Sequence, residues 1–208
     1  FDFPVLKTEA QLLEEREKAG SDIVPYYRHD AKALSQSRLA LASLDMDGYS
    51  FLKPVLEDNL AYVYSKGILA PSAGQNTEEL KDNPSSLIFL QKDRRAMKVP
   101  VSEVFTIEDA ETYLYDGLLK AYPEIDADSL YLGLPLNTVI IPDLIFDQQT
   151  TDLVHEEKVN FVSATQGVIR TGQVIVSEGE IVTAEIEQLL DSYKAEYDKS
   201  VGYGSSEV

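Results

Sequence analysis

The sequence predicts an α+β fold, in which helices pack with short antiparallel strand groups and a small C-terminal β unit is followed by an amphipathic helix. Three observations support this prediction. Apolar residues recur at helical spacing in several separate segments, short strand-like runs come in groups, and the last such group leads into a clean apolar stripe. Helices that alternate with strand groups are typical of α+β folds rather than of regular βαβ winding.

The first part of the chain is expected to be mainly helical. A capping box at Thr8 and Gln11 predicts a helix from Glu9 to Lys18. Pro25 then favours an extended backbone in the segment around it. A second helix is expected from Ala31 to Leu44, and a third begins near Leu52 and ends at a Gly67 cap.

The middle of the chain is expected to carry a strand pair and a helix. Residues 71–86 are mostly small, polar or acidic, which predicts a surface loop. Two strands follow, Leu87 to Gln91 and Met97 to Phe105, and Pro100 favours an edge position for the second. Thr106 is the expected N-cap of a helix that Pro123 closes, and a polar connector comes after it.

The C-terminal part is expected to form the small β unit and the final helix. An apolar stretch covers Asn137 to Phe146, and Thr151 to Phe161 is expected to be helical. Three short strands, separated by turns that contain glycine, are predicted at Val168–Arg170, Val174–Val176 and Glu180–Val182. Thr183 caps a last helix from Ala184 to Asp198. Its apolar stripe consists of Ile186, Leu189, Leu190, Tyr193 and Tyr197.

The composition is that of a folded domain. With 208 residues, of which 44% are hydrophobic, the chain can bury a core, and a domain of this length hides roughly 70% of its unfolded surface. We expect residues 1–200 to form the domain, as one body or as two subregions of about 1–140 and 141–200. Residues 201–208 are expected to be a linker.

Charge and cysteine usage exclude several classes of function. The formal net charge of −18 repels phosphate backbones, so nucleic acid is not expected as a partner. The chain has no cysteine, which excludes disulfides, thiolate metal sites and cysteine nucleophiles. No apolar run approaches the roughly 20 residues that cross a bilayer. Because the chain begins at Phe1 without a leader, we expect a fragment or a processed form.

Two histidines are the first candidates for chemistry. His29 and Asp30 spell the dipeptide of the HD phosphohydrolases, but that metal site needs further His and Asp ligands, so we expect the surface start of a helix instead. His155 opens a string like the zinc-protease helix, yet the position of the second ligand is Val159. We therefore expect His155 to lie on a solvated helix face.

Two acidic pairs begin like calcium loops. An EF-hand that starts at Asp45 would need Gly at its sixth position and Glu at its twelfth, where this chain has Ser50 and Leu56. The loop that starts at Asp126 has Tyr131 and Asn137 at the same two positions. Turns and helix caps are the expected roles of these acids.

Motifs for nucleophilic catalysis and phosphate binding are also missing from the sequence. There is no Gly-x-Ser-x-Gly and no phosphate loop, and the 36 acidic residues are too many to single out a glycosidase pair. We therefore predict that this chain is not an enzyme, with no catalytic, metal-binding or cofactor-binding residue assigned and no cofactor.

The segment from Pro142 to Tyr193 resembles the closing portion of the extracellular domain of the seven-transmembrane HD phosphohydrolase family. That portion has a "PNL.FD...T" entry, an acidic helix, a strand group with the pattern "G.V..G..IV..GE.VT" and a terminal helix. The matching residues are Pro142, Asp143, Leu144, Phe146, Asp147, Thr151, Gly167, Val168, Gly172, Ile175, Val176, Gly179, Glu180, Val182 and Thr183. The sequence departs from the family at Asp143, where Asn is frequent, and at Ser163 and Ala164, where a proline is common.

Two further segments resemble the same family. The N-terminal region is similar to its opening, where an acidic helix leads to a "V.PVY..D" segment, here matched by Val24, Pro25, Tyr27 and Asp30. The segment Gly67 to Leu69 and the later strand that ends at Thr106 resemble its middle. The resemblance therefore reaches both ends of the chain.

The resemblance implies an architecture and a role. A transmembrane helix precedes the extracytoplasmic domain, and further spans and a cytoplasmic HD domain with the metal centre follow it. Similar members are cyclic-di-AMP phosphodiesterases. We therefore expect an acidic, cysteine-free sensor domain for signal transduction, membrane-tethered in its parent protein, which binds an unknown extracytoplasmic ligand or an envelope protein.

Two alternatives remain open. The domain could be a structural or dimerisation module that contacts other envelope proteins, or a homodimer that senses nothing. It could also be an extracytoplasmic hydrolase with an acidic site, although no nucleophile, base and orienting group can be named for it.

Overall fold

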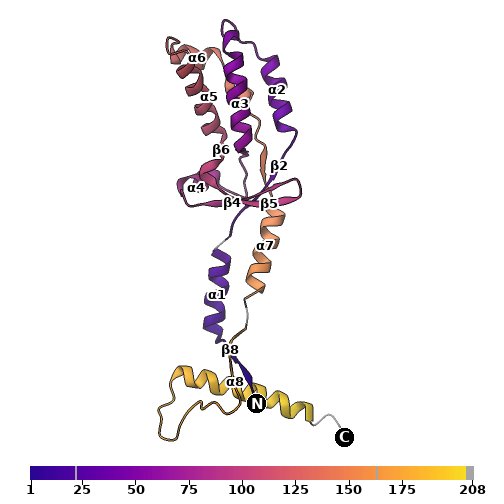
Figure 1. Cartoon of the computed structure of the whole chain (residues 1–208), viewed down its shortest axis with the longest axis vertical. Helices are drawn as coiled ribbons and strands as arrows, with labels where there is room; N and C mark the ends of the chain where they lie inside the picture. Colours follow the sequence, from indigo (N-terminus) through magenta and orange to yellow (C-terminus); the bar gives the residue numbers. More distant parts are fainter. Residues whose placement is uncertain (22, 163, 205–208) are drawn as a thin grey trace. The chain divides into compact units, whose positions relative to one another are not determined.

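The structure is a computed structural model that describes residues 1–21, 23–162 and 164–204, and its α+β fold confirms the predicted class (Figure 1). The chain divides into two compact units. Unit 1 comprises the described residues of 1–23 and 153–208, and unit 2 comprises residues 24–152. The sequence suggested a boundary near residue 140, whereas the chain passes from one unit to the other after Ile23 and after Asp152.

Unit 2 is built on a six-stranded mixed sheet of order β5-β4-β2-β7-β3-β6. Its strands are β2 (Tyr26–His29), β3 (Ile68–Leu69), β4 (Leu87–Lys92), β5 (Arg95–Pro100), β6 (Phe105–Thr106) and β7 (Leu144–Phe146). β2 pairs parallel with β4 and antiparallel with β7, and β3 pairs parallel with both β6 and β7. The antiparallel β4–β5 hairpin places β5 at the edge, as Pro100 predicts.

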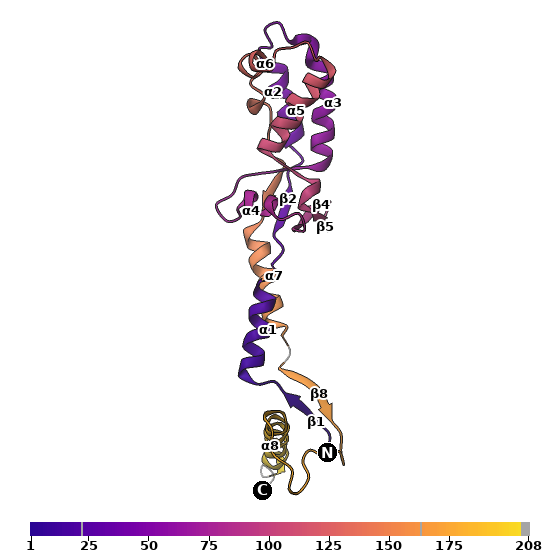
Figure 2. The same ribbon diagram turned by 90° about the vertical axis from the view of Figure 1, so that its left-hand side faces the viewer.

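Unit 2 contains helices as well as strands. The helices are α2 (Ala33–Ser43), α3 (Lys53–Lys66), α4 (Thr77–Asp82), α5 (Ile107–Ala121) and α6 (Ala127–Gly133), with short 3-10 turns at Ser50–Leu52, Val101–Glu103 and Leu136–Thr138. In two perpendicular views, α2, α3 and α5 run beside one another on the same side of the strands (Figure 2).

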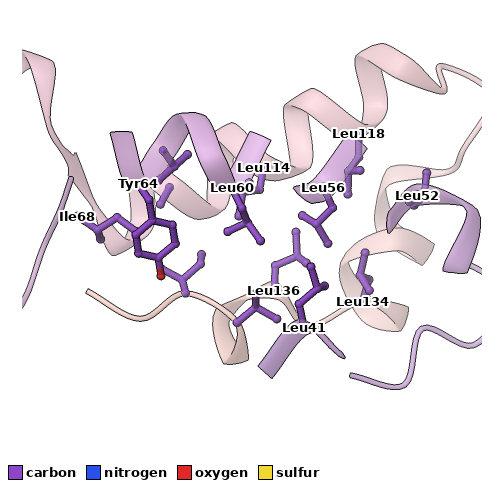
Figure 3. Close-up of a cluster of buried hydrophobic side chains, with 14 of the residues drawn as sticks. Leu41, Leu52, Leu56, Leu60, Tyr64, Ile68, Leu114, Leu118, Leu134 and Leu136 are labelled. Atoms are coloured by element: carbon purple, nitrogen blue, oxygen red, sulfur yellow. The ribbon is translucent and has the colours of Figure 1, made fainter. Parts of the chain in front are cut away.

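The main core of unit 2 lies between these helices (Figure 3). Leu56 and Leu60 from α3 meet Leu114 and Leu118 from α5, and all four side chains are at most 3% exposed. The helical spacing of these leucines gives each helix one apolar face, and burial of that face is worth about 25 cal/mol per Å². A second cluster, which includes Tyr27, packs on the sheet.

The start of α5 follows the sequence prediction in detail. The Thr106 hydroxyl accepts a hydrogen bond from the Asp109 amide at 3.0 Å, and the Asp109 carboxylate accepts one from the Thr106 amide at 3.2 Å. This capping box satisfies two amide groups that the first turn of a helix leaves free. α5 ends at Ala121, two residues before Pro123.

Unit 1 contains a two-stranded sheet and a long helix. β1 (Phe3–Leu6) pairs antiparallel with β8 (Thr165–Ile169), and α8 (Ala184–Gly204) packs against β1. α1 (Glu9–Ser21) belongs to the same unit, and α7 (Gln148–Asn160) begins in unit 2 and enters unit 1.

The core of unit 1 is small. Phe3, Val5 and Ile169 form its buried cluster, and Ile175 and Leu189 pack against it. Two side chains of α8 also bind the β1 backbone. The Leu6 amide donates to Ser192 Oγ at 2.8 Å, and Gln188 Nε2 donates to the Leu6 carbonyl at 2.6 Å.

Several element predictions were wrong. Val174–Val176 and Glu180–Val182 form no strand, and β8 pairs with β1 instead of with these segments. Gly172 and Gly179 do adopt the positive φ that the predicted turns require, at +83° and +81°. The turn signals were therefore correct, but the flanking residues pair with no strand in the described part of the chain.

Other differences concern helices. The loop predicted at 71–86 contains α4, and the connector after Pro123 contains α6. The strand predicted from Met97 to Phe105 is split by the 3-10 turn Val101–Glu103 into β5 and β6. α8 continues to Gly204, so only residues 205–208 of the expected linker remain, and these lie outside the described residues.

Candidate functional site

A histidine and a buried aspartate meet at the centre of the unit 2 sheet. β2 ends at His29 and β7 begins at Leu144, and their antiparallel register sets His29 opposite Leu144, next to Asp143. His29 Nε2 lies 3.3 Å from Asp143 Oδ2. The aspartate side chain is 2% exposed and the histidine side chain 21%, so the imidazole lies between the carboxylate and solvent.

Asp143 connects three strands. Its Oδ1 accepts a hydrogen bond from the Ile68 amide at 2.7 Å, and its own amide donates to the Ile68 carbonyl at 3.2 Å. Its carbonyl accepts from the Asp30 amide at 2.7 Å. The residue thus joins the ends of β2 and β7 to β3, through its side chain and its backbone together.

The electrostatics of Asp143 reflect two opposing effects. Burial raises the pKa of the Asp143 carboxyl above its usual value, because a charged group loses water in the sheet interior. The hydrogen bond from Ile68 and the nearby His29 both lower this pKa, since they favour the carboxylate. The net direction is upward, so the native state holds a proton at Asp143 more tightly than an exposed aspartate does.

The segment that leads to Asp143 is held by two hydroxyl groups from the helices. The Tyr64 hydroxyl of α3 donates to the Ile141 carbonyl at 2.7 Å and accepts from the Ile141 amide at 3.0 Å. The Ser37 hydroxyl of α2 donates to the Val139 carbonyl at 2.7 Å. Burial raises the pKa of Tyr64, so its proton stays in place. These contacts tie the helices to the strand that positions Asp143.

A cavity of about 260 Å³ opens beside the pair. It is lined by His29, Asp30, Ala31, Leu34, Ala61, Tyr64, Ser65, Lys92 and Asp143. Apolar walls with a few convergent polar groups are the usual setting of a small-molecule site, and typical sites for drug-sized ligands are roughly 300–1,000 Å³. The cavity therefore suits a small ligand.

The polar groups that line this cavity can form hydrogen bonds to a ligand. The hydroxyls that line it are already engaged, Tyr64 with Ile141 and Ser65 with the Tyr62 carbonyl at 2.5 Å. A nucleophile would need a free hydroxyl within hydrogen-bond reach of a base. The His29–Asp143 pair instead offers an imidazole to a ligand and a carboxylate that orients the imidazole.

A second hollow of about 430 Å³ lies near α5. Tyr62 stacks on Tyr113 with ring centroids 5.3 Å apart, and Lys66 lies 6.0 Å from the Tyr62 ring centroid. Lys81 Nζ donates to the Val101 and Val104 carbonyls, at 3.2 and 2.7 Å. The Lys81 ammonium is thus committed to the fold, which makes this hollow the weaker candidate.

The structure changes the role expected for His29 and leaves that of Asp30. His29 ends a strand rather than starting a helix, while Asp30 Oδ1 accepts from the Lys32 amide at 2.9 Å in a turn. Sequence reasoning missed the partner of His29, Asp143, because the two are far apart in the chain. The available signal was the departure from the family's Asn at Asp143.

His155 also lies in a different environment from the expected one. Its ring is half-buried in α7, and a Cβ atom at Gly20 of α1 would come within 3.2 Å of it. Its Nδ1 is buried and has no hydrogen-bond partner among the described residues. His155 therefore packs against α1, where a fully solvated helix face was expected.

The acidic pairs form turns and caps. Asp45 Oδ1 accepts from the Asp47 amide at 3.2 Å. Asp126 caps α6 and accepts from the Ser129 amide and hydroxyl at 3.0 and 2.8 Å, and these bonds lower the pKa of Asp126. Within the described ranges, no group of three or more His, Cys, Asp or Glu residues is arranged to hold a metal ion.

Comparison with known proteins shows which family the chain belongs to. A family model described as 7TM-HD extracellular matches residues 2–195, a range that contains unit 2 and most of unit 1. This family model describes the extracellular domain of a membrane protein. The chain belongs to the 7TM-HD extracellular family. No curated protein and no solved structure matches it.

The family match confirms two predictions, the family resemblance and the extracytoplasmic location. In the part of the chain that the structure describes, no helix is both long enough and apolar enough to cross a bilayer.

Proposed function

We propose that this chain is a sensory and regulatory domain that controls cyclic-di-AMP hydrolysis by a cytoplasmic HD domain of the same membrane protein. The signal site is the cavity beside His29 and Asp143. The observation that carries the proposal is a buried ionisable pair that opens to a cavity, since perturbed ionisable groups in clefts cluster at functional sites. The metal-dependent chemistry belongs to the HD domain, and this chain contributes recognition.

The proposed mechanism follows from the position of the pair. Asp143 joins three strands, so a ligand that binds His29 changes the hydrogen bonding of residues that hold the sheet together. A ligand shifts an equilibrium only if it binds two states with different affinity. We propose that the bound and free arrangements of the His29–Asp143 pair are those two states.

The output side of the proposal is α8. This helix is the last described element, and Leu189, Ser192 and Gln188 hold it against β1. In the full-length membrane protein, Leu189→Asp should change the rate of cyclic-di-AMP hydrolysis, because a charge would break the contact between α8 and the unit 1 core. Leu132→Asp is the matched control, since Leu132 is 88% exposed. Unchanged hydrolysis in a folded, inserted Leu189→Asp protein argues against the proposal.

The signal site has its own test. Compounds that raise the melting temperature of the domain should lose this effect in a His29→Ala variant, and keep it in an Arg38→Ala variant outside the cavity. A ligand at about 100 times its Kd stabilises the native state by about 2.7 kcal/mol, which a thermal shift detects. If such compounds stabilise the His29→Ala variant equally, the cavity is not their site.

A structural or dimerisation role is the second candidate. It is favoured by the exposed side chains of Val174, Ile181 and Val182, which are 74%, 83% and 55% accessible in a segment without a strand partner. A scaffold that pairs through this segment should self-associate in sedimentation experiments at increasing concentration. A monomer over the whole range contradicts the dimerisation role.

A further inference from the structure

Three aromatic rings stack along one face of unit 1. Phe1 and Tyr193 lie parallel, with ring centroids 5.3 Å apart and an interplanar angle of 11°. Tyr193 continues the stack to Tyr197, at 6.2 Å and 20°. We call Phe1, Tyr193 and Tyr197 the aromatic ladder. Phe3, which belongs to the unit 1 core, contacts Tyr193 edge to face, with ring centroids 5.6 Å apart. This contact joins the ladder to the core.

The ladder is open to solvent although it is apolar. Phe1 is 48% exposed, Tyr193 40% and Tyr197 50%. Val201, one turn further along α8, is 54% exposed and continues the same face, because positions four apart lie one above the other on a helix. Contiguous exposed apolar side chains of this kind mark an interaction surface.

The ladder links the first residue of the chain to the middle and C-terminal part of α8. Phe1 is the first residue, and Tyr197 lies in the last turns of α8, whose described part ends at Gly204. Phe1 and Gly204 both belong to unit 1. The family is that of the extracellular domain of a membrane protein, so a bilayer belongs to the surroundings of this domain.

The chemistry of the ladder fits the boundary between lipid and water. Tyrosine has an apolar ring and a polar hydroxyl, and aromatic residues are enriched where membrane spans meet water. We propose that the aromatic ladder, together with Val201, docks on the outer lipid–water interface of the bilayer. This proposal rests on family membership and does not depend on the proposed sensory function.

The charge of the chain narrows the type of lipid. With a formal net charge of −18, the domain is repelled by anionic head groups. Apolar and aromatic burial carries the contact instead, so zwitterionic phosphatidylcholine is the favoured surface.

The absence of cysteine makes the proposal directly testable. A single Val201→Cys substitution in the 208-residue chain can be labelled with an environment-sensitive fluorophore and leaves all three rings intact. Titration with phosphatidylcholine vesicles should shift its emission to the blue and saturate. Leu132→Cys, at a site of unit 2 that is 88% exposed, is the matched reporter and should not respond.

A second variant distinguishes vesicle binding by the ladder from non-specific adsorption of the protein to vesicles. Tyr193→Ser with Tyr197→Ser, introduced into the Val201→Cys reporter, should weaken vesicle binding several-fold, while far-UV circular dichroism and the melting temperature show that the domain stays folded. Vesicles with phosphatidylglycerol should bind the unaltered ladder more weakly than phosphatidylcholine alone.

Three outcomes overturn the proposal. The first is a Val201→Cys reporter that never responds to vesicles, and the second is an equal response at Leu132→Cys. The third is an emission shift that depends on protein concentration without lipid, which would assign the ladder to a second copy of the chain. None of these results bears on the His29–Asp143 cavity, which lies wholly in unit 2.

Discussion

Unit 2 encloses two clusters of buried side chains, one between its helices and one on its sheet, whereas the buried cluster of unit 1 consists of Phe3, Val5 and Ile169. Unit 1 also leaves the aromatic ladder and the side chains of Val174, Ile181 and Val182 exposed. Since burial of apolar surface is the main stabilising contribution to folding, unit 2 has the character of a rigid framework. Unit 1 buries fewer apolar side chains, so we expect it to open at a lower free energy than unit 2.

The largest test of this comparison removes part of the unit 2 core. Leu114→Ala should lower the free energy of unfolding by about 2–5 kcal/mol, because the fully buried side chain leaves a cavity between α3 and α5. Leu39→Ala is the control, since Leu39 is 68% exposed, and it should change stability by less than about 0.5 kcal/mol. Urea denaturation measures both. Equal effects would show that this core does not stabilise the framework.

Two buried tyrosines sharpen the comparison within unit 2. Tyr64→Phe should cost about 1–3 kcal/mol in denaturation, because the Ile141 amide and carbonyl lose their partner. Tyr27 is the matched control. Its hydroxyl is buried and has no hydrogen-bond partner among the residues that the structure describes, and burial raises the pKa of Tyr27 to about 12. Tyr27→Phe should therefore leave stability unchanged or slightly increased, and a large loss would reveal a partner for that hydroxyl.

The Asp143 carboxyl gives a pH-dependent prediction. Because the pKa of Asp143 is raised in the native state, its proton stabilises the fold at low pH, and this contribution is lost as pH rises from about 3.8 through the native pKa. The Asp143→Asn variant keeps a side-chain oxygen that can accept the hydrogen bond from the Ile68 amide, but its side chain does not bind or release a proton over this pH range. The stability of the variant relative to the wild type should therefore increase over that range of pH.

The measurement is urea denaturation of both proteins at a series of pH values from about 3.5 to 7. This range covers the ordinary pKa values of aspartate and histidine side chains. His29→Gln serves as the control that keeps the Asp143 titration. A stability difference between wild type and Asp143→Asn that stays constant with pH would contradict a raised pKa.

The smallest expected effect lies in unit 1. Ser192 is 2% exposed and accepts a hydrogen bond from the Leu6 amide, so Ser192→Ala should cost about 0.5–1.5 kcal/mol. We expect this loss as faster hydrogen exchange of the β1 and α8 amides, with unit 2 unaffected. Uniformly faster hydrogen exchange in both units would contradict the difference between them, because it would mean that the two units unfold together.

Local signals in the sequence predicted much of the framework. The Thr106 capping box, the closure of α5 before Pro123 and the edge position of Pro100 all depend on residues near one another in the chain, and the structure confirms each. The leucines of α3 and α5 were readable for the same reason, since a helix repeats its buried face every three or four residues.

Features that depend on distant pairing were not readable. β8 finds its partner in β1, at the other end of the chain, so the glycine turns after it suggested a hairpin group that does not form. His29 was judged by its neighbour Asp30, whereas its partner Asp143 comes from a strand that the sheet brings alongside. Sequence spacing carries no information about such a register.

The pairing of β1 with β8 also sets an order of assembly. A chain made from its N-terminus exposes Phe3 and Val5 long before Ile169 exists, and every residue of unit 2 is synthesised in the interval. Domains generally fold as units during synthesis, and closing a long loop delays the contacts between its ends. The framework can therefore be complete before the two ends join, and β1 is the segment that stays available to chaperones or to aggregation until then.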